Sequence, residues 1–278
     1  MKKILLFALP LLAMIAVSCQ KDNGELSGDD IIEFKDPNFL KALLTVQEID
    51  LDDEETDTYL MDVDANKDGK ISVNEAQKVK GLVLLKHIQG TEEWRTFNIR
   101  EMPEIKYFTA LTSLSCPYNQ LTSLDLSKNT ALEYLECHEN QLTTLDVSGC
   151  TALKDLGCDE NKLTTLDLSK NTALTYLGCY DNQLTTLDVS GCTALDGLEC
   201  YDNQLTSLDL SRCAALTELN CGRNQLTTLD ISGCTKLGCF TLSVFISPNP
   251  LKKIWINVNN QLGADFINAY KDIIEYVE

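Results

Sequence analysis

A pattern of 21 residues recurs six times between residues 111 and 236, and it constrains the fold more than any other feature of the chain. Each unit follows L-x-x-L-x-C-x-x-N-x-L-T-[TS]-L-D-[LVI]-S-x-[NC]-[TA]-A, except that Lys236 ends the sixth unit. Self-similarity at a fixed period of this length predicts a solenoid, in which each unit forms one coil and stacks on its neighbours. The units begin at Leu111, Leu132, Leu153, Leu174, Leu195 and Leu216, and a damaged seventh begins at Leu237.

The first nine residues of each unit have the pattern of a short strand followed by a bend. Leucine at positions 1 and 4 and cysteine at position 6, counted from the first leucine, predict a strand of a parallel sheet with these side chains inward. Asparagine at position 9 predicts a ladder of amides that satisfy backbone groups at the bend. The second half alternates again and predicts a second extended wall. The ladder residues are Asn119, Asn140, Asn161, Asn182, Asn203 and Asn224.

The repeats account for most of the 12 cysteines. Those at position 6 are predicted core residues, since free cysteine packs as a small hydrophobe. At position 19, cysteine and asparagine exchange, which indicates a tight turn rather than an obligate metal ligand; disulfides between some neighbours stay an open alternative. No C-x-x-C spacing occurs, so zinc and thioredoxin-like sites have no support. The position-19 residues are Asn129, Cys150, Asn171, Cys192, Cys213 and Cys234.

Over roughly residues 79–260 the chain resembles the bacterial leucine-rich repeat proteins that are called internalin-like. The resemblance rests on the L-x-x-L-x-C-x-x-N unit, whose third apolar position is cysteine here, and the family's usual unit is one residue longer. It implies a leucine-rich repeat solenoid, a β-rich right-handed superhelix with a parallel sheet. Six repeats over residues 111–236 would be closed by caps at 81–110 and 237–278, because the end coils otherwise expose apolar surface.

Residues 1–18 predict a signal peptide, because two lysines precede an apolar run from Ile4 to Val17 that is too short to span a bilayer. The sequence AVSC, which ends at Cys19, resembles the lipobox of bacterial lipoproteins. That resemblance implies acylation of Cys19, a lipidated tether over residues 19–30, and a lipid-anchored location at the bacterial outer membrane or cell surface. The alternative is an ordinary secretory signal with a chance cysteine.

A twelve-residue acidic run matches the calcium loop of EF-hands. Gly69 supplies the sharp turn at position 6 of the loop, and the residues that would donate oxygen ligands fall at the positions that an EF-hand uses. Because there is one loop only, the sequence predicts a structural Ca2+ site in a small helical, EF-hand-like cap over residues 31–80, and supports neither a paired sensor nor a dockerin. The alternative is a solvated acidic turn. The predicted ligands are Asp64, Asn66, Asp68, the carbonyl of Lys70, Ser72 through a water, and Glu75.

The coils differ from one another mainly on the first wall, at outward positions 3, 7 and 8. Tyrosines among acids on a rigid sheet are typical of a recognition surface, since tyrosine offers a large contact area at low entropic cost. The alternative is that these exposed residues vary between coils without a functional reason. The predicted ligand-binding face comprises Tyr118, Tyr134, His138, Asp159, Tyr176, Tyr180, Tyr201 and Asp202.

Charge narrows the range of partners. The formal net charge of -19 disfavours nucleic acid, because phosphate backbones repel such a surface. No Ser/His/Asp or Cys/His arrangement is assignable, so an enzyme is not predicted. We expect a lipid-anchored surface protein that binds another macromolecule. A protein ligand, for example one from a host, is favoured over a glycan. The alternatives are a glycan-binding protein and a purely structural surface-coat protein.

Overall fold

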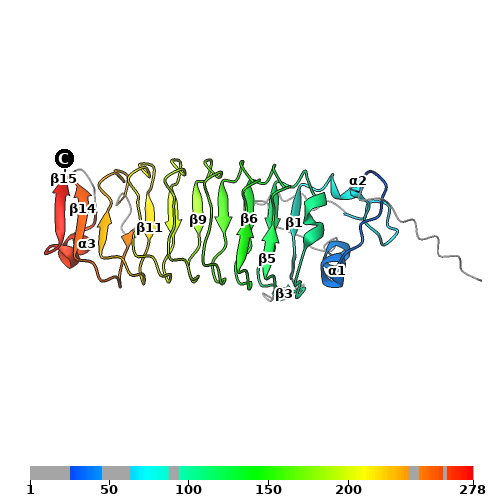
Figure 1. Cartoon of the computed structure of the whole chain (residues 1–278), viewed down its shortest axis with the longest axis horizontal. Helices are drawn as coiled ribbons and strands as arrows, with labels where there is room; N and C mark the ends of the chain where they lie inside the picture. Colours follow the sequence, from blue (N-terminus) through cyan, green and yellow to red (C-terminus); the bar gives the residue numbers. More distant parts are fainter. Residues whose placement is uncertain (1–25, 46–62, 88–93, 238–243, 259–261, 278) are drawn as a thin grey trace, which may run out of the picture.

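The computed structural model describes residues 26–45, 63–87, 94–237, 244–258 and 262–277, which form coils stacked along one long axis (Figure 1). One wall of the stack is an eight-stranded parallel sheet in the order β1-β4-β6-β8-β9-β10-β11-β13. Its strands are β1 (Gly81–Val83), β4 (Ser113–Ser115), β6 (Tyr134–Glu136), β8 (Asp155–Gly157), β9 (Tyr176–Gly178), β10 (Gly197–Glu199), β11 (Glu218–Asn220) and β13 (Val244–Phe245).

The constant period of the sequence sets the register of this sheet. Leu135 pairs with Leu156, Leu156 with Leu177, and Leu177 with Leu198, so equivalent residues of successive coils lie side by side. Each inward leucine therefore stacks on the leucines of the neighbouring coils. This arrangement confirms the predicted leucine-rich repeat solenoid with its coils of 21 residues.

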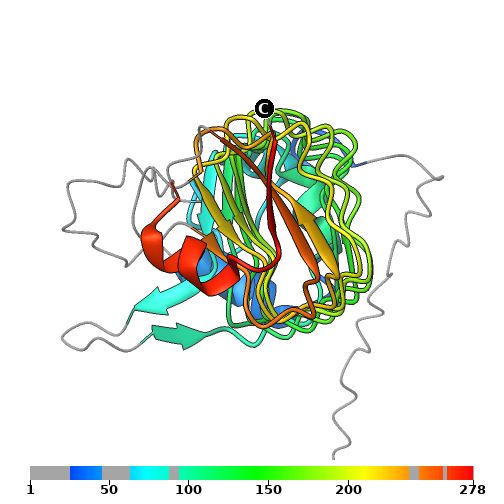
Figure 2. The same ribbon diagram turned by 90° about the vertical axis from the view of Figure 1, so that its left-hand side faces the viewer.

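A second wall faces the first across the core, as the view along the axis shows (Figure 2). It contains the pair β5 (Ser123–Asp125) and β7 (Thr144–Asp146), and the parallel set β12 (Thr228–Asp230), β14 (Lys253–Asn257) and β15 (Ile274–Val277). Each coil's aspartate at position 15 lies outward and accepts the N–H of the serine two residues later, as Asp167 Oδ1 does from Ser169 at 2.9 Å. These aspartates therefore cap the turns that follow the second wall.

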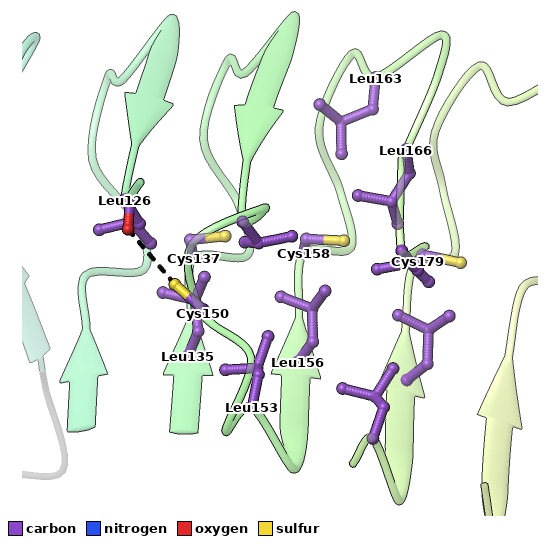
Figure 3. Close-up of a cluster of buried hydrophobic side chains, with 14 of the residues drawn as sticks. Leu126, Leu135, Cys137, Cys150, Leu153, Leu156, Cys158, Leu163, Leu166 and Cys179 are labelled. Carbon is purple, nitrogen blue, oxygen red and sulfur yellow. Dashed lines mark hydrogen bonds between the residues drawn. The ribbon is translucent and has the colours of Figure 1, made fainter. Parts of the chain in front are cut away.

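Leucine and cysteine side chains fill the space between the walls (Figure 3). All six position-6 cysteines are fully buried, and Figure 3 shows Cys137, Cys158 and Cys179 in one row among leucines. The ten cysteines in the described part of the chain are free thiols. Their packing agrees with the prediction that position 6 belongs to the core.

The asparagine ladder closes the bend after each first-wall strand. Asn161 Oδ1 accepts the N–H of Leu142 at 2.9 Å, and its Nδ2 donates to the carbonyls of Cys137, Cys158 and Asp159 at 3.0–3.1 Å. One amide thus joins two coils. The residue before each ladder asparagine adopts a positive φ, between 47 and 54°, which turns the chain sharply. These residues are Tyr118, Glu139, Glu160, Asp181, Asp202 and Arg223.

The segment before the repeats is part of the same core. It contains α1 (Pro37–Thr45), α2 (Val73–Ala76), the antiparallel pair β2 (Leu85–His87) and β3 (Trp94–Thr96), and a 3-10 helix (Pro103–Tyr107). The rings of Phe39 and Phe108, both fully buried, lie 6.2 Å apart and connect α1 to the segment that precedes the first coil. Helix α2 has only four residues, so the described N-terminal region does not establish a helix–loop–helix unit.

The other end of the solenoid keeps one feature of the repeats after the pattern breaks. Asn249 Oδ1 accepts the N–H of Leu226 at 3.0 Å, and Asn249 Nδ2 donates to the carbonyls of Cys221 and Ile246. It therefore takes the place of a seventh ladder asparagine. The last helix, α3 (Ala264–Tyr270), follows β14 and lies beside the final strands (Figures 1 and 2).

Candidate functional site

The outward side of the eight-stranded sheet carries the side chains at coil positions 3, 5 and 7, because side chains alternate along a strand. We call these residues of the six repeats the sheet face. In coil order they are Ser113, Ser115, Pro117, Tyr134, Glu136, His138, Asp155, Gly157, Asp159, Tyr176, Gly178, Tyr180, Gly197, Glu199, Tyr201, Glu218, Asn220 and Gly222.

Two adjacent glycines lie at the centre of the sheet face. Gly157 of β8 and Gly178 of β9 are direct partners in the sheet register. A Cβ at Gly157 would meet Glu136 Oε2 at 2.9 Å, and one at Gly178 would meet Asp159 Oδ1 and the Tyr176 hydroxyl oxygen, both at 3.4 Å. The missing side chains thus let carboxylates from two coils lie close over the backbone.

Three carboxylates near these glycines, Asp155, Asp159 and Glu199, have raised pKa values. Burial is the main cause for Asp155, and the nearby charge of Glu136 adds to it. Asp159 is only 7% exposed, and burial raises its pKa although the Tyr180 hydroxyl and His138 act in the other direction. For Glu199 the pKa is raised by burial and then by Asp159, and a hydrogen bond from Tyr176 partly offsets this shift. At the centre of the sheet face, burial thus disfavours the ionised form of these carboxyls, and neighbouring carboxylates add to that effect.

Aromatic rings flank the carboxylates on both sides. The rings of Tyr180 and Tyr201 stack at 4.4 Å between centroids and 7° between planes. The Tyr180 hydroxyl also donates to Asp159, which contributes to a pKa of Tyr180 that burial raises above its usual range. On the other side, the ring of Tyr118 meets the His138 ring edge-on at 5.3 Å.

His138 of coil 2 contacts the Tyr118 ring of coil 1 and the Glu136 carboxylate of its own coil. Its Nδ1 is 2.9 Å from Glu136 Oε2. This hydrogen bond raises the pKa of the imidazole, burial lowers it, and Asp159 raises it further. The protonated ring is therefore favoured relative to an exposed histidine.

The structure brings most of the predicted face residues together, with two at the rim. His138, Asp159, Tyr176, Tyr180 and Tyr201 converge on the centre through the contacts described above. Tyr134 lies outward on β6 and is 49% exposed. Tyr118 and Asp202 occupy position 8, at the edge of the sheet face, where Asp202 Oδ2 is 3.4 Å from the guanidinium of Arg223.

Sequence reasoning missed position 5 of the coils. Glu136, Gly157, Gly178 and Glu199 all occupy this position, and they supply the two central glycines and two of the carboxylates. The signal was available, because positions 3, 5 and 7 of a strand point to the same side. Position 5 therefore belongs to the candidate face together with the positions that were predicted.

The predicted calcium loop turns as its sequence requires. Lys67 and Gly69 adopt positive φ values of 57° and 78°. Asp64 is 5% exposed, and its two carboxylate oxygens accept the N–H groups of Asp68 and Gly69 at 3.1 and 2.8 Å. The Asp64 carboxylate, at the first position of the loop, thus holds the turn together.

Glu75 closes the same loop from its far end. Its Oε2 accepts the N–H of Ser72 at 2.9 Å and the Ser72 hydroxyl at 2.8 Å, and its Oε1 accepts the N–H of Asn66 at 3.4 Å. Burial tends to raise the pKa of Glu75, but these hydrogen bonds prevail and lower it. The carboxylate is therefore kept ionised, as a calcium ligand must be.

The fit of these residues to Ca2+ is partial. The donors are hard oxygen groups in the order that an EF-hand loop uses, which suits the ion. In the part of the chain that the structure describes, however, no three His, Cys, Asp or Glu side chains are grouped closely enough to hold a metal. Lys70 lies within the loop. Ser72 lies at the start of α2, where it caps the helix.

The remaining candidate, Cys19, lies outside the described residues. Among the described cysteines, burial raises the pKa of the thiols, to about 12 for Cys116 and Cys221. A thiol in this state is inert as a nucleophile. Within the described ranges, no helix is long and apolar enough to cross a membrane.

Comparison with known proteins supports the fold. No family model and no curated protein matches the chain. Among solved structures, internalin C2 from Listeria monocytogenes superposes with a TM-score of 0.54 at 21% identity, covering 88% of this chain and 94% of that one. A leucine-rich repeat protein from Leptospira interrogans gives 0.54 at 20% identity, covering 74% of this chain and 62% of that one.

A further similar structure is the functional domain of InlJ from Listeria monocytogenes, which includes a cysteine ladder. It is 27% identical over 86% of this chain and 61% of that domain, with a TM-score of 0.44, which is too low to add to the argument. The chain thus spans less than two thirds of the InlJ and Leptospira chains that it matches. The internalin C2 and Leptospira likenesses establish the leucine-rich repeat fold.

Proposed function

We propose that this protein is a lipid-anchored cell-surface protein that binds a protein ligand through the sheet face. The observation that carries the proposal is the contrast between the two walls of one solenoid. The second wall presents threonine or serine and aspartate in every coil, whereas the sheet face changes from coil to coil. A framework that holds its fold constant while one face varies is suited to recognition rather than to catalysis.

The chemistry of the sheet face supports a protein ligand. The stacked pair Tyr180 and Tyr201 is held rigid by ring contact and by the Tyr180–Asp159 hydrogen bond. Rigid tyrosines lose little entropy on binding and offer both apolar area and a polar tip. Because the supporting strands are fixed on both sides in the sheet, these rings are held in place before the ligand arrives.

The proposal is tested with the full chain in neutral detergent, on a panel of purified extracellular proteins and on a glycan array. For a ligand found there, we expect the triple variant Tyr176→Ala, Tyr180→Ala, Tyr201→Ala to weaken binding about tenfold or more. The matched control changes Thr144, Thr165 and Thr186 of the second wall to alanine. Unchanged binding by the tyrosine variant would place the ligand elsewhere, and self-association without any ligand would favour the surface-coat alternative.

Lipid anchoring rests on the predicted lipobox that ends at Cys19. Several acyl chains on this residue would hold the protein firmly, at about 0.8 kcal/mol per buried methylene. In a bacterial host, a clickable fatty acid should label the wild type and leave Cys19→Ala unlabelled. Label that persists in the variant would contradict the proposed anchor.

We also propose a structural Ca2+ site in the loop from Asp64 to Glu75. The left-handed turn at Lys67 and Gly69 and the ionised, buried Glu75 support it. Bound there, Ca2+ would be held by Asp64, Asn66, Asp68 and Glu75 and would supply charge neutralisation that orders the loop. Dissociation constants near 10⁻⁴–10⁻³ M are typical of extracellular modules, so millimolar calcium is the relevant condition.

A further inference from the structure

We propose that the sheet face docks a basic segment of its protein ligand, with a guanidinium or ammonium group lying between Glu136, Asp159 and Glu199. The inference rests on the proposed function, because it assigns a partner chemistry to the same face. It goes beyond that function by naming the charge of the partner and the point on the face where that charge is bound.

The first support is a charge imbalance confined to one side of the molecule. None of the eighteen sheet-face positions is lysine or arginine, and the imidazole of His138 is the one basic group among them. The rim at position 8 adds four more acids and one arginine, Arg223, which lies against Asp202. The carboxylates of the sheet face are Glu136, Asp155, Asp159, Glu199 and Glu218.

The basic residues of the repeats lie elsewhere on the coils. Lys154 is at position 2, where its ammonium pairs with Glu133 at 2.6 Å. Lys128, Lys170 and Arg212 are at position 18, on the turn after the second wall, and are exposed. Because the chain places no lysine or arginine on the sheet face, and His138 is outnumbered there by five carboxylates, a cation from another molecule would complement the charge of this face.

The second support is the geometry over the two central glycines. Glu136 Oε2 lies close to Gly157, and Asp159 Oδ1 lies close to its neighbour Gly178. Adjacent strands of a sheet are about 4.8 Å apart. Acceptors held over neighbouring strands suit the planar fork of a guanidinium, which donates several hydrogen bonds at once. A side chain at either glycine would crowd these carboxylates.

The neighbouring rings add a second contact for an organic cation. The stacked rings of Tyr180 and Tyr201 lie beside Asp159, and ring faces attract lysine and arginine groups. Burial is the main cause that raises the pKa values of Asp155, Asp159 and Glu199, and neighbouring carboxylates add to it, although Tyr180 and His138 partly offset the shift of Asp159 and Tyr176 that of Glu199. A metal ion is the less suitable occupant, because among the described residues no three such side chains are grouped for one.

The test uses a fluorescein-labelled hepta-arginine peptide and measures its binding to the full chain by fluorescence anisotropy. An ionic strength of about 0.1 M limits the range of non-specific attraction to about 10 Å. One variant carries Glu136→Gln, Asp159→Asn and Glu199→Gln on the sheet face. The matched control carries Asp125→Asn, Asp167→Asn and Asp188→Asn on the second wall, so that both lose the same charge.

We expect wild type to bind hepta-arginine, and the sheet-face variant to bind it about tenfold or more weakly, since buried, hydrogen-bonded charge pairs govern affinity more than rim charges do. The control should stay within about twofold of wild type, and hepta-glutamate should not bind. Equal losses in the two variants would show a response to net charge alone and would overturn the inference. Absence of hepta-arginine binding to wild type would overturn it as well.

Two further measurements keep the result interpretable. The single change Glu136→Gln, which leaves Asp159 and its hydrogen bond intact, should weaken hepta-arginine binding in the same direction if the triple variant loses its fold by circular dichroism. Failure of the inference is also distinct from failure of the proposed function. A protein ligand that depends on Tyr176, Tyr180 and Tyr201 but binds the sheet-face charge variant normally would leave the function standing and overturn only the basic partner.

Discussion

At the scale of single residues, the ladder asparagines add side-chain hydrogen bonds between coils to those of the backbone. Asn161 is 8% exposed and makes one accepted and three donated hydrogen bonds to the backbone. No other side chain of similar size offers both an acceptor and two donors in this arrangement. Leucine or valine at this position would leave the Leu142 N–H without its partner. It would also remove one hydrogen bond from each of three carbonyls, which keep donors from Asn140, Asn182 and Glu139.

We therefore expect Asn161→Ala to lower the free energy of unfolding by about 3 kcal/mol, because an unsatisfied buried N–H costs about 1–3 kcal/mol and three carbonyls each lose one further hydrogen bond. Urea unfolding followed by circular dichroism measures the change. Gln183→Ala, at the exposed position 10 of the next coil, is the control and should change stability by less than about 0.5 kcal/mol. A loss for Asn161→Ala no larger than that of the control would contradict the ladder's role.

The exchange of cysteine and asparagine at position 19 has a physical reason that the sequence did not show. Cys150 Sγ contacts the carbonyl of Leu126 at 3.4 Å, and Asn171 Nδ2 donates to the carbonyl of Val147 at 3.1 Å. Both acceptors lie 24 residues earlier. A thiol and an amide thus serve the same backbone group, and the sequence revealed the exchange but not the shared acceptor.

At the scale of elements, the sequence predicted the strands and the ladder that recur in every coil, and it missed features outside the repeats. The strands β4 to β11 and the ladder follow from the period, because every unit has the same constraints. Asn249 was missed because it lies 25 residues after Asn224, out of step with the 21-residue spacing. Strand β1 was missed as a member of the main sheet, since its pairing with β4 depends on tertiary contact rather than on a pattern.

The calcium loop is an element whose chemistry was predicted from sequence and whose occupancy is testable. Ca2+ at about 1 mM should raise the melting temperature of the wild type, because a ligand that binds only the folded state stabilises it. Glu75→Ala should abolish that rise. It also removes the side chain that bonds Ser72, so its melting temperature without calcium should be lower than that of wild type.

Magnesium at the same concentration and the variant Asn74→Ala, outside the ligand set, serve as controls for the calcium effect. Magnesium should raise the wild-type melting temperature less than calcium does, since magnesium requires a smaller octahedral site. Calcium should still raise the melting temperature of Asn74→Ala. A wild-type melting temperature that calcium leaves unchanged would contradict the proposed site. An equal rise in Glu75→Ala would contradict the assignment of Glu75 as a ligand.

At the scale of the whole molecule, the two walls have opposite pKa behaviour. On the first wall and its rim, burial and then neighbouring charges raise carboxyl pKa values; these groups are Asp155, Asp159, Glu160, Asp181 and Glu199. On the second wall, hydrogen bonds with serine two residues later lower them; these groups are Asp125, Asp167, Asp188 and Asp209. The ionised carboxylate is therefore disfavoured on the first wall, mainly by burial, and favoured on the second wall by hydrogen bonds.

The sign of the pH dependence follows for each wall. A carboxyl whose pKa is raised by folding binds its proton more tightly in the folded state, so stability is gained as pH falls through that raised pKa. His138, with a raised pKa, acts in the same direction. A carboxyl whose pKa is lowered stabilises the fold above its unfolded value, about 3.9 for Asp, and that contribution is lost at lower pH.

The melting temperature should therefore rise as the pH is lowered from neutral towards the raised pKa values of the first-wall groups, and fall below about 4, where the contribution of the second-wall aspartates is lost. The variant with Glu136→Gln, Asp159→Asn and Glu199→Gln should show a smaller rise. The variant with Asp125→Asn, Asp167→Asn and Asp188→Asn should keep the rise and lose part of the acid decline. Because both variants remove the same charge, equal curves would mean that overall repulsion, and not the separation of the two walls, determines the pH dependence.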